Sequence, residues 1–349
     1  MGNTSIDVLM RLLRKALLGK DASLPDSANW SEVMRLAAMH GLSAIAFDGL
    51  ESLWSSANDI PKSTKLQWAT LSLRQETLYK HNWNVACQLS ELWKRKGIEA
   101  LVLKGRTIAQ YYPIPEHRYS CDLDVFIEGE NWEKACDVLK EQGICLVNDV
   151  YKEVEFTYNG VYVECHRYIT PVRGNKTLLQ FEKYLRNILS KSSVDYFEGT
   201  SLRRPSLLFV VLLYIEHALG DLLHGHLTLK HVVDWVVLRH QNFDRIQLEW
   251  ICKKFGFEKF LYLVDALADV VESTRDIDSL PDSYKEVFDS LFNTRPSKNK
   301  PKSWFAKRVS LFFEILGNGH YYRDFGYCSM PNFLFNAVWS HLFNKKVEL

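Results

Sequence analysis

The spacing of apolar residues along the chain changes twice, and each change predicts a change of secondary structure. Through about residue 97, apolar side chains recur with the 3.6-residue period of a helix, and the first stripe consists of Ile6, Leu9, Leu12, Leu13 and Leu17. Asn29 and Ser31 are candidate caps of a second helix, and Lys65–Leu92 predicts a long helix. Helical spacing returns from about residue 178, where Leu207–Leu219 predicts a buried helix and Leu229–Arg239 predicts another.

Between these helical regions the spacing falls to the two-residue period of strands. Ile98–Leu103 and the run that starts at Asp122 predict two strands, and a helix is expected at about Asn131–Gln142. Asn159-Gly160 then favours a two-residue hairpin turn. Its return strand alternates apolar Val161, Val163 and Cys165 with polar Tyr162, Glu164 and His166. The chain is therefore expected to be an α+β protein, with a small mixed-sheet core at 98–170 between helical regions at 1–97 and 171–349.

Composition narrows the class of protein. Of the 349 residues, 47% are hydrophobic and 24% charged, which is typical of a soluble globular chain. The net charge of +1 argues against a long polyanion or an anionic membrane surface as partner. Seven cysteines without a CxxC pair favour reduced thiols in the cytoplasm over a zinc or disulfide framework. The longest apolar run, Leu207–Ile215, is far shorter than the ~20 residues of a membrane span.

Two carboxylates, Asp122 and Asp124, interrupt an apolar run that otherwise reads as a buried strand. Residues i and i+2 of a strand share a face, so both side chains project together. Adjacent like charges favour a bound divalent cation with oxygen ligands. Glu164, on a separate strand, offers a third carboxylate. The alternative is a strand end at the surface with solvated acids, and for Glu164 a solvent-facing hairpin residue.

The residues just upstream suggest phosphate contacts. Lys104-Gly105 ends the first predicted strand, where a glycine lets backbone N–H groups approach a phosphate and Lys104 or Arg106 adds positive charge. Arg118 can pair with a phosphate in bidentate fashion. Alternatively, Lys104 and Arg118 are ordinary surface cations.

The ordered set of these residues resembles an uncharacterised family of nucleotidyltransferases in the polymerase-β-like superfamily. The resemblance covers roughly residues 98 to 240, and Glu164 departs from it because the family usually has Asp there. It rests on Lys104-Gly105, Tyr112-Pro113, Arg118, Asp122-Leu123-Asp124, Val163-Glu164-Cys165-His166, Ile215-Glu216-His217-Ala218 and Val232-Val233-Asp234-Trp235.

The resemblance implies an Mg²⁺-dependent enzyme that moves a nucleoside monophosphate from an NTP to an acceptor hydroxyl. Asp122, Asp124 and Glu164 are then the catalytic metal ligands of a two-metal displacement. The residues expected to hold the NTP are Lys104, Gly105, Arg118 and Ser120. The alternatives are a nucleotidyltransferase that modifies proteins (AMPylation, as in toxin-like relatives) and a non-catalytic nucleotide-binding or interaction protein.

Histidines offer further candidates. His166 can act as a general base or orient Glu164, but a buried hydrogen-bonding role is the favoured interpretation. Downstream histidines could form a second metal cluster with Asp234, yet they lack the spacing of a zinc site, so a hydrogen bond between His217 and Asp234 is favoured. The histidines concerned are His217, His224, His226 and His231.

The acceptor is the least determined part of the prediction. A sugar, an antibiotic-like molecule, a nucleic-acid end and a protein side chain all remain open, and we expect a small or saccharide-like molecule bound between the α/β core and the helices that carry His217 and Asp234. The basic loop Arg295–Lys302, with Trp304 and Phe305 beside it, could contact nucleic acid. A solvated loop is favoured because the overall charge is nearly neutral.

Overall fold

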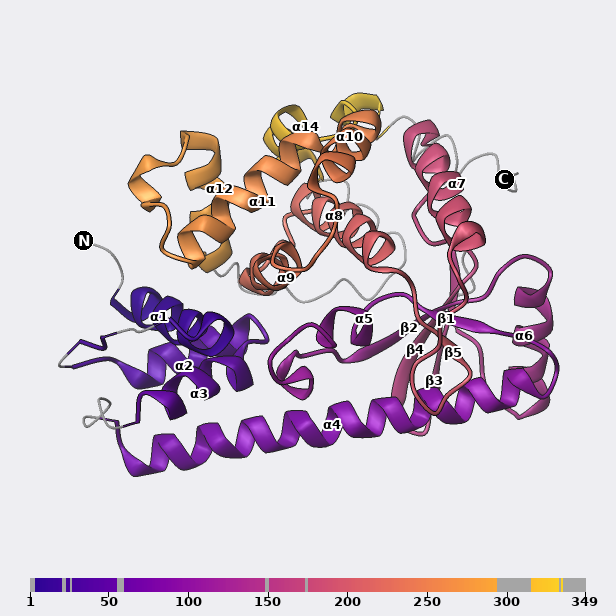
Figure 1. The fold of residues 1–349 in the computed structure, drawn as a ribbon, viewed down its shortest axis with the longest axis horizontal. Helices are drawn as coiled ribbons and strands as arrows, with labels where there is room; N and C mark the ends of the chain where they lie inside the picture. Colours follow the sequence, from indigo (N-terminus) through magenta and orange to yellow (C-terminus); the bar gives the residue numbers. More distant parts are fainter. Residues whose placement is uncertain are drawn as a thin grey trace. The chain divides into compact units, whose positions relative to one another are not determined.

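The structure is a computed structural model that describes residues 4–20, 23–25, 27–54, 60–147, 151–172, 175–293, 315–332 and 334. It divides into two compact units, one made of residues 1–167, 193–205 and 236–241 and the other of 168–192, 206–235 and 242–349. The first unit contains α1 (Thr4–Leu18), α2 (Trp30–Met39), α3 (Ser43–Ser52), α4 (Lys62–Lys94), β1 (Ala100–Val102), α5 (Arg106–Ala109), η1 (Pro115–His117), β2 (Asp122–Phe126), α6 (Asn131–Glu141), β3 (Glu153–Tyr158), β4 (Val161–His166) and β5 (Leu202–Arg203) (Figure 1).

The strands form one five-stranded mixed sheet in the order β3-β4-β2-β1-β5. β4 pairs parallel with β2 and antiparallel with β3, while β1 pairs antiparallel with β2 and parallel with β5. The predicted α+β class with a mixed sheet and helical flanks is confirmed. The two-residue strand β5 was not predicted, because two residues are too few to display a period.

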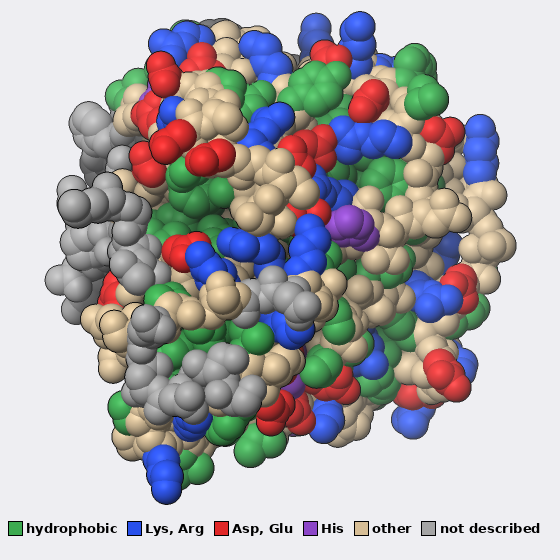
Figure 2. All heavy atoms as spheres, turned by 60° about the vertical axis from the view of Figure 1, so that its left-hand side comes forward, with side chains coloured by type: hydrophobic (Ala, Val, Ile, Leu, Met, Phe, Trp, Pro, Cys, Tyr) green, Lys and Arg blue, Asp and Glu red, His purple; other side chains and the backbone are tan. Residues whose placement is uncertain are grey.

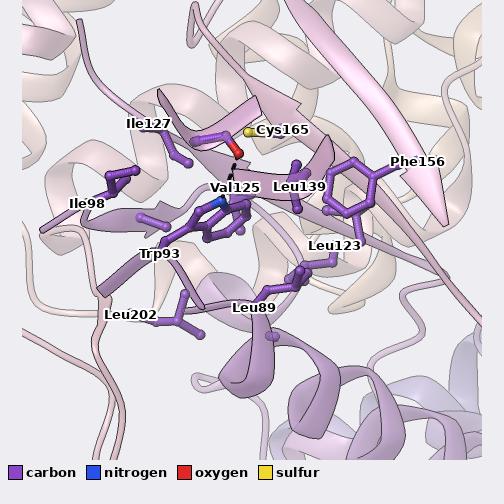
Figure 3. Packing of buried hydrophobic residues seen from close by; sticks show 14 of the residues in the cluster. Leu89, Trp93, Ile98, Leu123, Val125, Ile127, Leu139, Phe156, Cys165 and Leu202 are labelled. Carbon is purple, nitrogen blue, oxygen red and sulfur yellow. Dashed lines mark hydrogen bonds between the residues drawn. The ribbon is translucent and has the colours of Figure 1, made fainter. Parts of the chain in front are cut away.

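One face of the sheet supplies the core of the first unit. Leu123 and Val125 of β2 lie in one buried cluster with Leu89 and Trp93 of α4, and α6 adds Leu139 to it (Figure 3). Helices α4 and α6 therefore cover the face to which the strands direct their apolar alternate residues. The opposite face carries the other alternate residues, among them Asp122 and Asp124.

The N-terminal helices follow the predicted apolar stripe. Asn29 caps α2, its side chain accepting a hydrogen bond from the backbone of Glu32, whereas Ser31 lies inside the helix. Helix α1 crosses α3 so closely that a Cβ at Gly49 would lie 2.0 Å from the carbonyl oxygen of Leu12. Only glycine permits this approach of two helix backbones.

The second unit is helical. Its α8 (Leu207–Leu223) is buried on nearly all sides, as its continuous apolar sequence predicts, and α9 (Leu229–Arg239) contributes residues to both units. The buried Glu182 of α7 accepts hydrogen bonds from the backbones of Ile169 and Thr170 and from Arg186, so its charge is compensated. The helices are α7 (Lys176–Lys191), α8 (Leu207–Leu223), α9 (Leu229–Arg239), α10 (Arg245–Phe255), α11 (Glu258–Val271), η2 (Ile277–Ser279), α12 (Asp282–Phe292) and α14 (Gly319–Phe325).

Two sequence predictions are left as they stand. The boundaries 1–97, 98–170 and 171–349 stay a prediction, and the basic loop Arg295–Lys302 with Trp304 and Phe305 lies outside the described residues. Within the described residues, no helix is long and apolar enough to cross a membrane.

A buried histidine fixes the segment that leads into β2. His117, 7% exposed at the end of η1, has Nδ1 2.8 Å from Oδ2 of Asp48 on α3 and Nε2 3.2 Å from Oε1 of Glu76 on α4. Burial lowers the pKa of His117, but the hydrogen bonds and charges of these two carboxylates outweigh it, so the net shift is upward. One imidazole thus ties η1 to two of the N-terminal helices.

We predict that His117→Gln lowers the free energy of unfolding by about 1.5–3 kcal/mol at pH 6, because two carboxylates lose a charged donor. Since the folded-state pKa of His117 is raised, this contribution is present below the unfolded value of about 6.5 and lost as the pH rises through the folded value. The difference between wild type and variant should therefore shrink toward alkaline pH in denaturant titrations. The matched control is His226→Gln at an exposed histidine, and a pH-independent difference would contradict the prediction.

Candidate active site

The polar face of the sheet is organised by the register of three neighbouring strands. Asp124 of β2 lies beside Glu164 of β4, which in turn lies opposite Glu155 of β3, so three carboxylates form one row across the sheet. On either side of this row, the same register aligns Asp122 with Tyr162 and Thr157, and Phe126 with His166 and Glu153. The predicted pair therefore belongs to a larger acidic surface.

The hairpin brings the side chains of β3 and β4 as close as a sheet allows. The backbone N–H and carbonyl of Glu155 bond to Val147 on the outer side of β3, so Glu155 and Glu164 form a non-hydrogen-bonded pair. In such pairs the side chains are nearest one another. Asn159 and Gly160, with φ of 48° and 80°, provide the predicted two-residue turn that sets this register.

Asp124 is the buried member of this row of carboxylates. Its side chain is 3% exposed, and its Oδ1 lies 2.9 Å from Nζ of Lys104 and 3.0 Å from Nε2 of His166. Burial raises the pKa of Asp124, but Lys104 and His166 outweigh it and hold the pKa well below its usual range. Burial likewise lowers the pKa of Lys104, and attraction to Asp124, Glu164 and Asp122 reverses the shift to a net increase. Both groups are therefore charged at neutral pH.

His166 is 1% exposed and lies among three carboxylates. Its Nδ1 is 2.9 Å from Oε2 of Glu153, and its Nε2 is 3.5 Å from Oε2 of Glu164 as well as near Asp124. Burial lowers the pKa of His166, yet these carboxylates raise it to about 9. Burial raises the pKa of Glu153, but His166 and Lys152, whose Nζ is 3.0 Å away, lower it to about 2.

Sequence reasoning assigned no role to Glu153. Its position could have been found, because a two-residue turn at Asn159-Gly160 fixes the pairing of every later residue of the hairpin. Counting back from the turn places Glu153 opposite His166. The proximity of both to Asp124 also requires that β4 lie beside β2, which the local pattern does not reveal.

Three of the predicted NTP-binding residues lie near Asp122, at the beginning of β2. Gly105 has φ of 69°, and a Cβ there would lie 3.0 Å from Oγ of Ser120, so this close approach requires glycine. Ser120 Oγ lies 3.3 Å from Oδ1 of Asp122. Arg118 is buried, 6% exposed, and donates from Nη1 to the carbonyl oxygen of Gly105 at 3.2 Å. Gly105, Arg118 and Ser120 are thus brought together next to Asp122.

A divalent metal fits the donor set of this surface. Ligand atoms of Asp124, Glu164 and His166 all lie within 4.8 Å of one another. The ammonium of Lys104 contacts Asp124, so a positive charge is already accommodated beside this carboxylate. Asp122 shares their face but is not within that group. Carboxylate oxygens are the ligands that Mg²⁺ prefers.

The downstream histidines form a second group, on α8 and the start of α9. Asp221 Oδ2 lies 3.0 Å from Nε2 of His231 and 3.6 Å from Nε2 of His217. The backbone N–H of Thr228 donates to Nδ1 of His231, so in the neutral ring Nε2 carries the proton and donates to Asp221. This hydrogen bonding disfavours a metal there. The predicted bond from His217 to Asp234 stays a prediction.

Comparison with known proteins agrees with this geometry. Residues 26–271 match the model of a family described as an uncharacterised nucleotidyltransferase, which includes N-terminal helices beyond the predicted range of resemblance. No curated protein and no solved structure matches the chain. The match spans well over half of the sequence and confirms the predicted family. The chain therefore belongs to the uncharacterised nucleotidyltransferase family and is a transferase of nucleoside monophosphates from nucleoside triphosphates.

Proposed function

We propose that the protein is an Mg²⁺-dependent enzyme that transfers a nucleoside monophosphate from an NTP to the hydroxyl of a small or saccharide-like acceptor. The observation that carries the proposal is the charge arrangement at Asp124. A buried carboxylate lies in a row with Glu164 and Glu155, and a lysine at the end of β1 compensates it. This arrangement concentrates negative charge where a cation is needed and places the ammonium of Lys104 beside it.

In the proposed site, Asp122, Asp124 and Glu164 hold the divalent metal. A metal bound there would neutralise triphosphate oxygens and lower the pKa of the attacking hydroxyl. The three carboxylates would orient the metal, because β2 and β4 are paired from Asp122 to Phe126 and hold these side chains on one face. Ser120, 3.3 Å from Oδ1 of Asp122, restricts the rotation of that carboxylate.

Lys104, Gly105, Arg118 and Ser120 are the proposed contacts of the triphosphate. Lys104 is 23% exposed, so its ammonium can leave Asp124 and reach a phosphate once a metal compensates that carboxylate. Arg118 donates from Nη1 to the carbonyl oxygen of Gly105, which places its guanidinium beside the turn after β1. The sequence-based role of Arg118 as a direct phosphate contact is retained as part of the proposal.

The proposed acceptor is small because the net charge of +1 does not favour a long polyanion as partner. The chain carries 43 basic and 42 acidic residues, and the face drawn in Figure 2 has both kinds interspersed. Binding of a nucleic acid depends on clustered cations. The seven free cysteines favour a reducing compartment, and we propose that the enzyme is cytoplasmic.

We predict that Asp122→Asn combined with Asp124→Asn abolishes the rise in melting temperature that Mg²⁺ and NTP give to the wild type. NTP turnover should fall about 100-fold or more, because the developing phosphate charge loses its preorganised compensation. Asp122→Asn alone should show the same direction, and it avoids disturbing the buried Asp124. The matched control is Asp137→Asn on the exposed face of α6.

Three outcomes would redirect the proposal. Equal NTP binding and turnover by the double variant and the wild type would refute the metal assignment. Transfer of label from ATP to a polypeptide band of a cell lysate would replace the small acceptor by a protein. No Mg²⁺-dependent NTP binding in calorimetry would favour the non-catalytic alternative.

We further predict that Lys104→Met lowers the free energy of unfolding in EDTA by about 3 kcal/mol, because the buried carboxylate of Asp124 loses one of its two positive partners. His166 is the partner that it retains among the contacts described above. Mg²⁺ should then raise the melting temperature of the variant more than that of the wild type, because it restores the missing charge. The control Lys140→Met removes an exposed ion pair with Asp137 and should cost about 0–1 kcal/mol. Equal Mg²⁺ responses of Lys104→Met and wild type would show that Lys104 does not occupy the place of a metal.

A further inference from the structure

We infer that Nε2 of His166 is itself a ligand of the active-site metal and that Glu153 is the outer carboxylate that orients it. This inference rests on the proposed function, because it concerns the metal of that same site. It differs from the sequence-based expectation in two respects. The first ligand shell gains a nitrogen, and the strand β3 gains a role in the metal site.

The positions of the three ligand atoms support a shared ion. Nε2 of His166 is 3.0 Å from Oδ1 of Asp124 and 3.5 Å from Oε2 of Glu164. Neighbouring ligands of an octahedral ion with bonds of about 2.1 Å are separated by about 3 Å. The side chains are therefore already at the spacing that ligation requires, and no strand has to move.

The far side of the imidazole is arranged as in known metal sites. Nδ1 of His166 lies 2.9 Å from Oε2 of Glu153, and the same oxygen lies 3.0 Å from Nζ of Lys152. A histidine that binds a metal nearly always offers its other ring N–H to a carboxylate, a carbonyl or a water, which fixes the tautomer and increases the basicity of the ligating nitrogen. Glu153, an ion-pair partner of Nδ1 on the neighbouring strand, is at the distance that this role needs.

The second histidine group provides an internal comparison. In His231, a backbone N–H donates to Nδ1, so the proton of the neutral ring must be on Nε2, the nitrogen that faces Asp221. In His166, Nδ1 faces Glu153 and Nε2 faces Asp124, so a metal that displaces the proton of Nε2 leaves the ring neutral, with its proton on Nδ1 beside an acceptor. Of these two histidines, only His166 has an acceptor rather than a donor beside Nδ1, as a ring that binds a metal through Nε2 requires.

A nitrogen ligand also changes which metal the site prefers. Mg²⁺ selects oxygen ligands, whereas imidazole favours first-row transition ions. We therefore expect Mn²⁺ to bind the full-length protein more tightly than Mg²⁺ does. Mn²⁺ is paramagnetic and keeps six-coordinate geometry, which makes it a suitable probe of the ligands.

The test measures the binding of Mn²⁺ to the full chain in two ways. Titration gives the affinity, and pulsed electron paramagnetic resonance detects ligand nitrogen. The wild type should show hyperfine coupling to ¹⁴N, and His166→Gln should lose it, whereas His231→Gln should retain it. Glu153→Gln should weaken Mn²⁺ binding by about 10–100-fold. Glu133→Gln, an exposed glutamate of α6 on the opposite side of the sheet, should leave the affinity unchanged.

The failure of this inference can be separated from failure of the proposed function. If Mn²⁺ binds, and Asp124→Asn weakens it, but the wild type shows no ¹⁴N coupling, the metal site stands and the role of His166 is wrong. Equal affinities for Glu153→Gln and Glu133→Gln would remove Glu153 from the site. If the wild type binds no divalent ion, with or without NTP, the proposed function itself falls. Because the coupling is measured in the wild type, poor folding of His166→Gln leaves the test decisive.

Discussion

The burial of the Asp124 carboxylate is the constraint on which the rest of the first unit depends. A buried charged carboxylate is costly without compensating partners, and Lys104, just after β1, and His166 of β4 provide positive ones. These two contacts join three strands through a single side chain. The order β4-β2-β1 is thus an electrostatic requirement of Asp124 as well as a result of backbone pairing.

The two faces of the sheet differ in composition: one is apolar and packs against helices, and the other carries carboxylates. Apolar residues of β2 and β4 pack on α4 and α6 and stabilise the unit, while the alternate residues of the same strands carry the carboxylates. Because side chains alternate strictly, a shift of one residue in the hairpin would exchange the two sets and place Glu164 in the core. The turn at Asn159-Gly160 therefore determines which face of the sheet carries the proposed metal ligands.

Much of this arrangement follows from local patterns in the sequence. The helical and strand periods, the cap at Asn29 and the hairpin at Asn159-Gly160 are consequences of residues close together in the chain. The contacts of His117 with Asp48 and Glu76 do not follow from local patterns, because these partners lie 69 and 41 residues away in the chain. The same holds for the contact of Lys104 with Asp124, since charge alone does not say which carboxylate a lysine reaches.

The glutamates of β3 have a consequence for the association of this protein with itself. β3 is an edge strand, and an exposed edge invites pairing with another chain. Among the described residues, Val147 bridges to Glu155 at this edge, and Glu153 and Glu155 place carboxylates on the strand. A second molecule that tried to extend the sheet would have to bring its own strand against these charges. The glutamates that concentrate negative charge beside Asp124 thereby also disfavour extension of the sheet by a second molecule.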